Sequence, residues 1–502
     1  MALIMRRRCW PWLLVVLAAG VATAQEPDWS AKAQQAKEAM SGGHFEVAAA
    51  RYRELTQAFP DNPGLAMNLG LALHSASRYE EAVQQFQKAL RMQPKLAGGW
   101  FLLGVDYQRL NRPADAIPAL RRALELEPQN EAARLELGDA LFQAAQYSEA
   151  LREFRAITVT SPRNSKAWLG VGLSYSSLAG QAFQSLQRSY ADSALVQILI
   201  AQSLADQHQY RSAYQRYRRA LQLDPGLIEA HRAIASIYRI TEHPDWAVEE
   251  EARIREPERS VCGDASLACL FSQKKHRDLV TAAEGKKTAE ALYWSARSYQ
   301  ELALEAQEML AQLPPSAELH QLLAVMYDLR ELYLDAAGEW REALVFQPGN
   351  RIFRKKLAWS LSGAGEWDAV VEVVKELQKD DAANPELAFL LGDSLLKLQH
   401  PEEAAPQLEK VVVRELSNLR AQASLGTAYF LTGRFTEAIL HLEPALPIDR
   451  DGKVTYQLAQ AYRSTGDSRK AGELMKKYAE LQKASADAKA GLNQGNEITA
   501  PR

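Results

Sequence analysis

The stretch Trp100–Pro128, WFLLGVDYQRLNRPADAIPALRRALELEP, contains the unit from which most of this chain is built. Apolar residues recur in it at spacings of three and four, which predicts two short amphipathic helices. Pro128 ends the stretch, and a proline cannot continue a helix because it lacks the N–H donor and clashes with the preceding turn. The stretch therefore predicts a helical hairpin that is closed by a proline.

The unit recurs at a constant interval along the sequence, as the even spacing of Pro60, Pro94, Pro128 and Pro162 shows. A small residue lies near the eighth and the twentieth position of each unit, where it lets paired helices approach closely. Large residues between them fill the space between neighbouring pairs. Since no single unit can bury its apolar face alone, the units must stack on one another. Examples of the small residues are Gly70, Gly104, Gly138, Gly172, Gly392 and Gly426, with Ala48, Ala82, Ala116 and Ala150.

The pattern W-x2-LG-x2-Y … A … F … AL … P resembles the tetratricopeptide repeat, and Trp100–Pro128 and Trp168–Tyr175 carry it most completely. The resemblance implies an all-α fold, a right-handed α-α superhelical solenoid of about fourteen TPR-like helical hairpins. The units that start at Ser165, Cys262 and Thr288 are shorter than the rest. In phase, the units start near Trp29, Pro63, Ala97, Glu131, Ser165, Ala194, Ile228, Cys262, Thr288, Ala317, Arg351, Pro385, Leu419 and Gly452.

The N-terminal segment has the composition of an export signal. Three arginines precede a short apolar core, and an A-x-A cleavage site follows at Ala22–Ala24, so residues 1–24 are predicted to be a cleaved signal peptide. A membrane anchor is the alternative, but the apolar run is too short to span a bilayer comfortably. No cysteine follows the apolar core, which argues against a lipoprotein. We therefore expect a periplasmic or secreted protein without a stable membrane anchor.

The mature chain is expected to consist of two repeat blocks and a tail. The stretch REPERSVCGDASLAC breaks the repeat pattern most strongly. It predicts a junction between an N-terminal block, residues 25–259, and a C-terminal block, residues 260–485. Residues 486–502 are small and polar, which predicts a disordered tail.

Two cysteines survive signal cleavage, Cys262 and Cys269. An oxidising compartment permits a disulfide between them. On one continuous helix they would lie about 10 Å apart, which is too far for a bridge, so Cys262 would need to lie in a preceding loop. Two buried thiols are the alternative, and the sequence leaves both open.

Composition and motifs argue against several function classes. The formal net charge is only −3, so the basic field typical of nucleic-acid binding is absent. No H-E-x-x-H or C-x-x-C motif occurs, and EGKKT, Glu284–Thr288, lacks the first glycine of a phosphate loop. Repeats fill nearly the whole mature chain and leave little length for a catalytic domain. We expect no enzyme activity, no cofactor and no metal site.

The resemblance implies a ligand surface instead, since tetratricopeptide arrays bind peptides on a concave face lined by their first helices. The carboxylate clamp of the family needs Lys and Asn where this chain has Met67 and Leu71, or Phe101 and Val105, so that clamp is absent. An apolar groove is predicted in its place, suited to an amphipathic helix or an extended apolar peptide. The alternative is that these residues only pack against each other. The predicted groove residues are Met67, Leu71, Phe101, Val105, Leu135, Phe142, Leu169 and Leu173.

The matching positions of the later units are more mixed and suit a polar partner. Aromatic residues alternate there with polar ones: Trp359, Phe389, Phe430 and Tyr456 with Lys355, Asp393, Gln460 and Arg463. The chain as a whole resembles an exported bacterial tetratricopeptide protein. That resemblance implies a non-catalytic scaffold or adaptor in the cell envelope, with a protein or peptide as partner. The alternatives are a self-associating structural protein and an accessory subunit of an envelope polysaccharide, glycosyl-transfer or secretion system.

Overall fold

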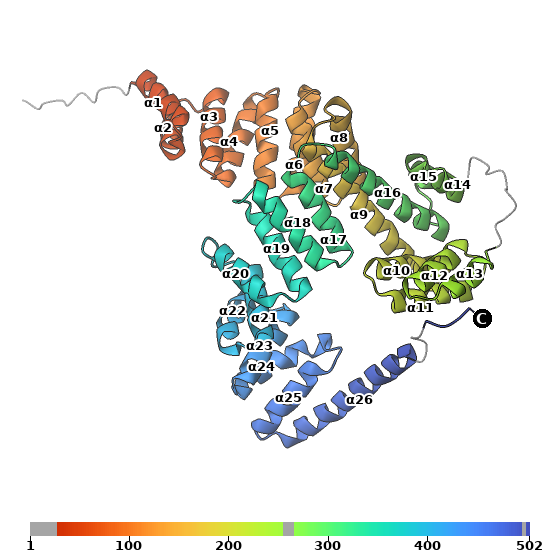
Figure 1. The fold of residues 1–502 in the computed structure, drawn as a ribbon. Coiled ribbons are helices and arrows are strands. Elements are labelled where there is room, and N and C mark those ends of the chain that lie inside the picture. The colour runs from red at the N-terminus through yellow and green to blue at the C-terminus, as the bar shows by residue number, and fades with distance from the viewer. Residues whose placement is uncertain (1–27, 255–265, 494–497, 502) are drawn as a thin grey trace, which may run out of the picture. The chain divides into compact units, whose positions relative to one another are not determined.

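The computed structural model describes residues 28–254, 266–493 and 498–501, except for the side chains of residues 485 and 487–493. Within these residues it contains twenty-six α-helices, one short 3-10 helix and no strand (Figure 1). The helices belong to two compact units, Met1–Gln129 and Asn130–Arg502. The predicted all-α repeat fold is confirmed.

The first unit consists of three helical hairpins. Its helices are α1 (Trp29–Ser41), α2 (Phe45–Ala58), α3 (Pro63–Ser75), α4 (Tyr79–Met92), α5 (Ala97–Arg109) and α6 (Pro113–Leu126). The second unit begins with the hairpin of α7 (Glu131–Gln143) and α8 (Tyr147–Thr160), which is followed by the long helix α9 (Ser165–Ser189).

Six shorter helices and a second long one come next. They are α10 (Ala194–Asp206), α11 (Tyr210–Leu223), α12 (Ile228–Ile240), α13 (Pro244–Glu251), α14 (Leu267–Ser272), α15 (His276–Ala283) and the long α16 (Ala289–Ala311). The remainder is again a regular series of hairpins. It contains α17 (Ala317–Leu329), α18 (Tyr333–Phe346), α19 (Arg351–Ala364), α20 (Trp367–Gln378), α21 (Pro385–Lys397), α22 (Pro401–Arg414), α23 (Leu419–Leu431), α24 (Phe435–Ala445), η1 (Leu446–Ile448), α25 (Lys453–Ser464) and α26 (Ser468–Asn493).

The helix starts follow the repeat period of the sequence. α3, α5 and α21 begin at Pro63, Ala97 and Pro385, where the sequence predicts new units, and the other unit starts agree closely where they are described. Each unit-closing proline lies just beyond a second helix, as Pro60 does beyond Ala58. The period therefore places the hairpins correctly. The unit start at Cys262 lies outside the described residues.

An asparagine caps the first helix of many units, a signal that the period analysis missed. The side chain of Asn130 accepts a hydrogen bond from the backbone N–H of Ala133 at 2.9 Å, and the side chain of Asn164 accepts one from Ala167 at 3.0 Å. Such caps satisfy backbone donors that the first helical turn leaves without a partner. Asn62, Asn350, Asn384 and Asn418 cap their helices in the same way.

The small residues of the repeat allow the two helices of a hairpin to touch. A Cβ atom on Gly70 would lie 2.6 Å from the Phe86 ring, and one on Gly426 would lie 2.7 Å from Leu442. Ala48, Ala82, Ala116 and Ala150 are completely buried. The predicted close approach is therefore present in the hairpins.

A side chain on the first helix of several units holds the preceding linker. Trp100 Nε1 donates to the carbonyl of Pro94 at 2.9 Å, and Trp168 Nε1 donates to the carbonyl of Pro162 at 2.8 Å. His231 Nε2 lies 3.2 Å from the carbonyl of Pro225 at the equivalent place. These contacts fix the angle between one repeat and the next.

Two of the predicted units differ from the rest, because each is one long helix and not a hairpin. The units that start at Ser165 and Thr288 form α9, with 25 residues, and α16, with 23 residues. These two helices pair with each other antiparallel. The Tyr190 hydroxyl donates to the carbonyl of Lys287 at 2.9 Å, and the rings of Tyr175 and Tyr299 lie 6.1 Å apart.

The segment between these two helices forms a side branch, which we define as α10–α15. Its core includes Ala182 and Leu186 from the C-terminal half of α9, together with Tyr293 and Ala296 from the N-terminal half of α16. The N-terminal half of α9 instead contacts α17. Gly172 lies so close to this helix that a Cβ atom on it would be 2.7 Å from Leu322. The long pair thus closes the branch and also continues the main series of repeats.

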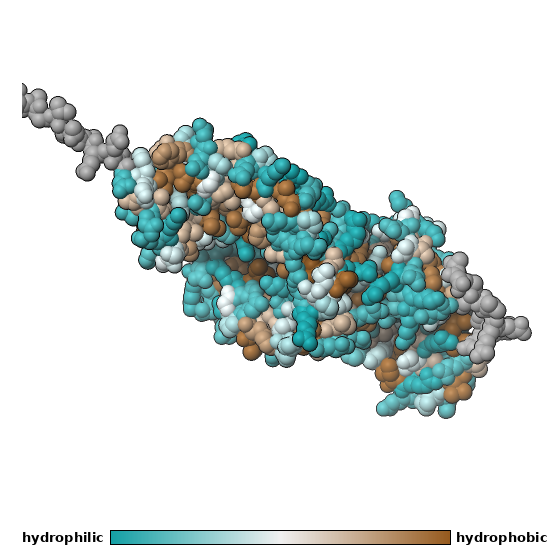
Figure 2. Space-filling model, turned by 90° about the horizontal axis from the view of Figure 1, so that it is seen from above, coloured by the Kyte–Doolittle hydropathy of each residue, from teal (hydrophilic) through white to brown (hydrophobic). Residues whose placement is uncertain are grey.

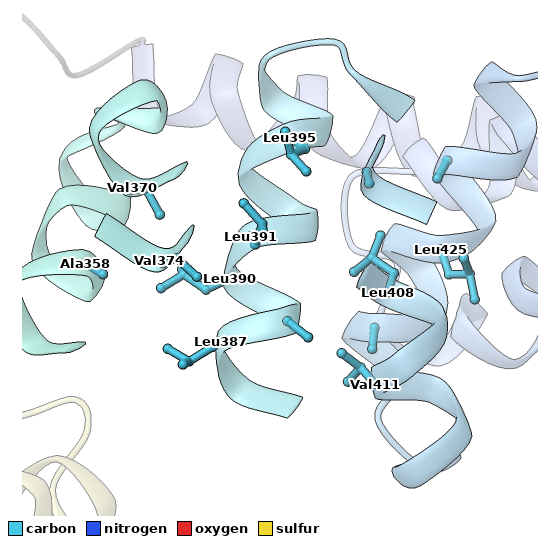
Figure 3. Packing of buried hydrophobic residues seen from close by; sticks show 14 of the residues in the cluster. Ala358, Val370, Val374, Leu387, Leu390, Leu391, Leu395, Leu408, Val411 and Leu425 are labelled. Atoms are coloured by element: carbon cyan, nitrogen blue, oxygen red, sulfur yellow. The ribbon is translucent and has the colours of Figure 1, made fainter. Parts of the chain in front are cut away.

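The series α17–α26 has one continuous apolar core. Figure 3 shows Leu387, Leu391 and Leu395 of α21 between Val374 of α20 and Leu408 of α22. The face drawn in Figure 2 is mostly hydrophilic, with hydrophobic residues in scattered patches. The expected block boundary at residues 259–260 and the signal peptide 1–24 lie outside the described residues.

The end of the chain differs from the predicted disordered tail. α26 continues to Asn493, and Ile498–Pro501 are described again. The small, alanine-rich composition of residues 484–493 suits a helix as well as it suits a tail.

Candidate functional site

The eight predicted groove residues are divided between the two units, four in each. In the first unit, Met67 and Leu71 lie on α3, and Phe101 and Val105 lie on α5. Leu71 is 36% exposed and Val105 is buried at 9%, while Met67 and Phe101 are half-buried. Three of the four side chains are therefore accessible to a ligand, and Val105 is part of the core.

A polar pair joins the two helices that carry these residues. Nδ1 of His74 on α3 forms a hydrogen bond with the carboxylate of Asp106 on α5, and the Asp106 side chain is completely buried. Burial raises the pKa of Asp106, which the bond to His74 and the charge of Arg109 oppose. The pair ties one first helix to the next and fixes their spacing on this face.

In the second unit, Leu135 and Phe142 lie on α7, and Leu169 and Leu173 lie on α9. All four are half-buried, and the Phe142 ring lies 5.1 Å from the ring of Tyr147. Asp139 shares their face of α7 and is exposed, yet desolvation by the surrounding protein raises the pKa of its carboxyl to about 7. Glu136 adds to this rise, and Lys166 opposes it. The peptide-groove role of the eight residues stays a prediction.

A pocket formed by first helices lies further along the second unit, and we call it the C-terminal pocket. It has a volume of about 560 Å³ and is formed by α21, α23, α25 and the loop after η1. Its lining includes Asp393, Lys397 and Lys453, together with Leu431 and Ile448. Leu431 is 52% exposed and Ile448 is 39% exposed. The pocket therefore combines accessible apolar surface with charges of both signs.

Hydrogen bonds between neighbouring helices hold the floor of the C-terminal pocket. Ser424 Oγ donates to Asp393 at 3.0 Å, and Thr427 Oγ1 donates to Gln457 Oε1 at 2.9 Å. At the edge, the Asp449 carboxylate accepts a hydrogen bond from the backbone N–H of Thr455 at 2.7 Å. These bonds cross from α21 to α23 and from α23 to α25, so they prevent the walls of the pocket from sliding.

Sequence reasoning placed Asp393 on this mixed surface but missed Leu431, Ile448 and Asp449. Asp393 lies at a regular first-helix position, whereas the other three lie at a helix end or in a loop. An available signal was LPIDRDGK, Leu446–Lys453, which replaces the regular linker between two units.

Comparison with known proteins identifies the repeat. Models described as tetratricopeptide repeat match residues 34–97 and 389–453, residues 109–171, and residues 453–485. The chain is a tetratricopeptide repeat protein. Proteins built from this repeat are typically non-catalytic interaction scaffolds, and nothing in the described residues points to enzymatic activity.

Solved tetratricopeptide structures match parts of the chain. A MamA structure of MSR-1 is 24% identical and covers 34% of this chain and 98% of its own, with a TM-score of 0.31. MamA from Desulfovibrio magneticus RS-1 is 22% identical and covers 34% and 96%, with a TM-score of 0.31. YrrB, described as a TPR protein with an unusual peptide-binding site, is 22% identical and covers 40% and 88%, with a TM-score of 0.27. No curated protein matches this tetratricopeptide repeat protein.

Three further features bear on the tetratricopeptide scaffold. Among the described residues, no cluster of three or more His, Cys, Asp or Glu side chains is arranged to hold a metal ion. None of the described helices is long and apolar enough to cross a membrane. Cys269 on α14 is disulfide-bonded. Cys262 lies outside the described residues, so its pairing with Cys269 stays a prediction.

Proposed function

We propose that this tetratricopeptide protein is an exported scaffold of the bacterial cell envelope that binds segments of partner proteins on the surface of its first helices. The C-terminal pocket carries the proposal, because three consecutive first helices contribute side chains to one open pocket of about 560 Å³. We propose it as the main site and the apolar first-helix residues of α3 and α5, in the first unit, as a second contact surface.

The chemistry of the pocket favours a short segment with one apolar side chain and flanking charges. Leu431 and Ile448 provide accessible apolar surface. Lys397 and Lys453 attract carboxylates, and Asp393 attracts a cation. Lys397 Nζ also lies 5.8 Å from the Trp367 ring, which orients its side chain.

The bonding beneath the pocket supports binding without rearrangement of the scaffold. Ser424 and Thr427 are already fixed by partners on neighbouring helices. A preformed surface loses little conformational freedom when a partner binds, so more of the contact energy appears as affinity.

The test is site-specific photo-crosslinking in the native cell. A photo-reactive residue replaces Leu431 in the pocket, and the matched control replaces Val413, an apolar residue of the second helix α22 that is 79% exposed. A second pair uses Phe101 on α5 and Arg122 on α6. We expect one defined partner at Leu431 and none at Val413.

Each outcome of this experiment bears on the proposal. Capture of a partner at Phe101 but not at Arg122 supports the second contact surface. Adducts only with further copies of this chain support a self-associating structural protein and contradict the scaffold. Equal capture at Leu431 and Val413, or none at either, removes the pocket as the binding site.

Export is tested separately by fractionation of the same cells and N-terminal sequencing of the mature chain. We expect the chain outside the cytoplasm, beginning at Gln25. A chain that keeps residues 1–24 and stays in the cytoplasm contradicts the envelope assignment.

A further inference from the structure

The C-terminal segment Ile498–Pro501 lies against the side branch, which is far away from it in sequence. Figure 1 shows the end of the chain beside α11. The Tyr238 hydroxyl donates to the carbonyl oxygen of Thr499 at 2.7 Å, and the Tyr214 hydroxyl donates to the same oxygen at 3.0 Å. Ile498 packs against the apolar core of α10–α13. The segment is thus held by hydrogen bonds to its backbone carbonyl at Thr499 and by the apolar packing of Ile498.

The hydrogen-bond donors and acceptors of Tyr214, Tyr238 and Thr499 match one another. A carbonyl oxygen accepts two hydrogen bonds, so both tyrosine donors are satisfied by Thr499. The Thr499 hydroxyl lies 3.1 Å from the Tyr214 oxygen and can donate to it. The two tyrosine oxygens are 3.3 Å apart and, without the segment, can share only one hydrogen bond. One buried donor would then lack this protein partner, which costs free energy unless water replaces it.

Both tyrosines are embedded in the branch. Tyr214 is 1% exposed, Tyr238 is 0% exposed, and their rings lie 5.8 Å apart. Trp246 packs edge-on against Tyr238 with ring centres 5.6 Å apart, and it stacks on His243 at 4.0 Å. Burial and the neighbouring Tyr214 raise the pKa of Tyr238, so its hydroxyl remains a donor. The rings of the pair are thus packed among their neighbours in the branch.

The sequence marks Tyr214 as an exception within the repeat. Tyr238 lies at a first-helix position that is tyrosine in several units, such as Tyr107 and Tyr429. Tyr214 lies at a second-helix position where nine other units have an aliphatic residue and the last unit has Gly472. Those residues are Ala49, Val83, Ile117, Leu151, Val248, Ala337, Val371, Ala405 and Ile439. The regular packing of a hairpin does not need a hydroxyl there.

A cavity of about 750 Å³ adjoins Ile498. The loop between α10 and α11 lines it with His208 and Gln209, and the loop between α12 and α13 lines it with Thr241 and His243. Nδ1 of His243 is buried and has no hydrogen-bond partner within the described part of the chain. A peptide that extends N-terminally from the apolar residue can therefore make further polar contacts.

We propose that the branch is a peptide-binding module whose resident ligand is the chain's own C-terminal segment, recognised by Tyr214 and Tyr238 through the Thr499 carbonyl. Its ligand class is an extended, uncharged segment in which a β-branched apolar residue precedes threonine. The tethered segment keeps the module occupied, and a partner segment of this class must displace it. This site is separate from the C-terminal pocket and does not depend on the proposed function.

The experiment measures binding of a fluorescent peptide of residues 494–502, QGNEITAPR, by anisotropy. The proteins are the full chain and a chain that ends at Asn493. We expect saturable binding to the shortened chain and binding at least about tenfold weaker to the full chain, because the tethered segment competes at high effective concentration. A peptide with Ile498→Asp should not bind.

Matched variants of the shortened chain test the two hydroxyls. Tyr214→Phe with Tyr238→Phe keeps both rings and should weaken peptide binding about tenfold. Tyr217→Phe alters a buried tyrosine one turn along α11 and should leave binding unchanged. Far-UV circular dichroism checks the fold, and Tyr214→Phe alone serves if the double variant does not fold.

Three results overturn the proposal. The first is no binding of the peptide to the shortened chain. The second is equal affinity for the double phenylalanine variant or for the Ile498→Asp peptide. The third is equal affinity of the full and the shortened chain, which would mean that the tethered segment does not occupy the site. Since only this chain and its own peptide are needed, failure here leaves the crosslinking result on the C-terminal pocket unaffected.

Discussion

The series α17–α26 and the side branch α10–α15 are built from the same hairpin but are closed differently. In the series, each helix packs against the next one in sequence, as α21 does against α22 in Figure 3. The branch is closed by α9 and α16, which are far apart in sequence and meet at Tyr175 and Tyr299. A repeat array can therefore carry an internal branch without a change in its local packing rules.

The difference has an energetic consequence. The stability of a regular array is close to a sum of hairpin terms and nearest-neighbour terms. The pair α9–α16 takes part in two arrays at once, because its halves contact the branch core and α17 respectively. A substitution that disrupts this helix pair should destabilise both arrays, whereas a substitution that disrupts one hairpin should destabilise only the array that contains it.

The largest effect is expected from a charge within the long pair. Ala303 on α16 is buried at 2% and lies one turn from Tyr299. Ala303→Glu should lower the free energy of unfolding by about 4 kcal/mol, because an unpaired buried charge has no compensating contact. Hydrogen exchange should then rise in α9, α16, α17 and the branch.

Ala230→Glu is the matched control for that variant. Ala230 on α12 is completely buried but belongs only to the branch core. Its exchange increase should be confined to the branch. If Ala303→Glu also affects only one of the two arrays, the long pair does not connect them.

Glycine substitutions compare a tight contact with an open position. Gly426→Ala on α23 should cost about 1–3 kcal/mol, since its Cβ would lie 2.7 Å from Leu442 and 3.1 Å from backbone. Gly180→Ala on α9 should stabilise by about 0.5–1 kcal/mol, since apart from its own helix backbone no atom lies within 4 Å of the added Cβ. Denaturant unfolding followed by circular dichroism measures both, and effects of the same sign would contradict the packing described.

The smallest effect concerns pH and Asp139. Its pKa is raised from the usual 3.8 to about 7, so the fold favours the protonated form. Stability linked to this group is complete below pH 3.8 and is lost as the pH rises through 7. Asp139→Asn should therefore melt slightly above the native chain at pH 8, and the difference should disappear near pH 4. A difference that is independent of pH would contradict the shifted pKa.

The same comparison explains what sequence could predict. Hairpins were predictable because Gly70 and Phe86, or Gly426 and Leu442, recur at one fixed spacing within a unit. The equivalent partner of Gly172 would be Arg188, but the structure places Leu322 there. No local period encodes a contact between residues so far apart in sequence. The shorter units at Ser165 and Thr288 were the sequence signal that these two units differ from the others.

The candidate sites follow the same pattern. Asp393 was predictable from its first-helix position. Leu431 and Ile448 were not, since Leu431 is the last residue of its helix and Ile448 lies in the irregular linker between two units. The role of Tyr214 depends on Thr499, which no repeat period connects to it. Its aliphatic counterparts in other units were the only sequence signal.

Excision of the branch tests the central claim most directly. Residues 191–286 are removed, and Tyr190 is joined to Lys287 by a flexible linker of about four residues, which can span roughly 13 Å. Because Tyr190 and Lys287 are hydrogen-bonded in the native chain, α9 and α16 should form an ordinary hairpin. We predict a helical, monodisperse protein in which α9, α16 and α17 keep native protection from hydrogen exchange. Loss of that protection, or failure of the shortened chain to fold, would contradict the account of α10–α15 as a branch closed by one helix pair.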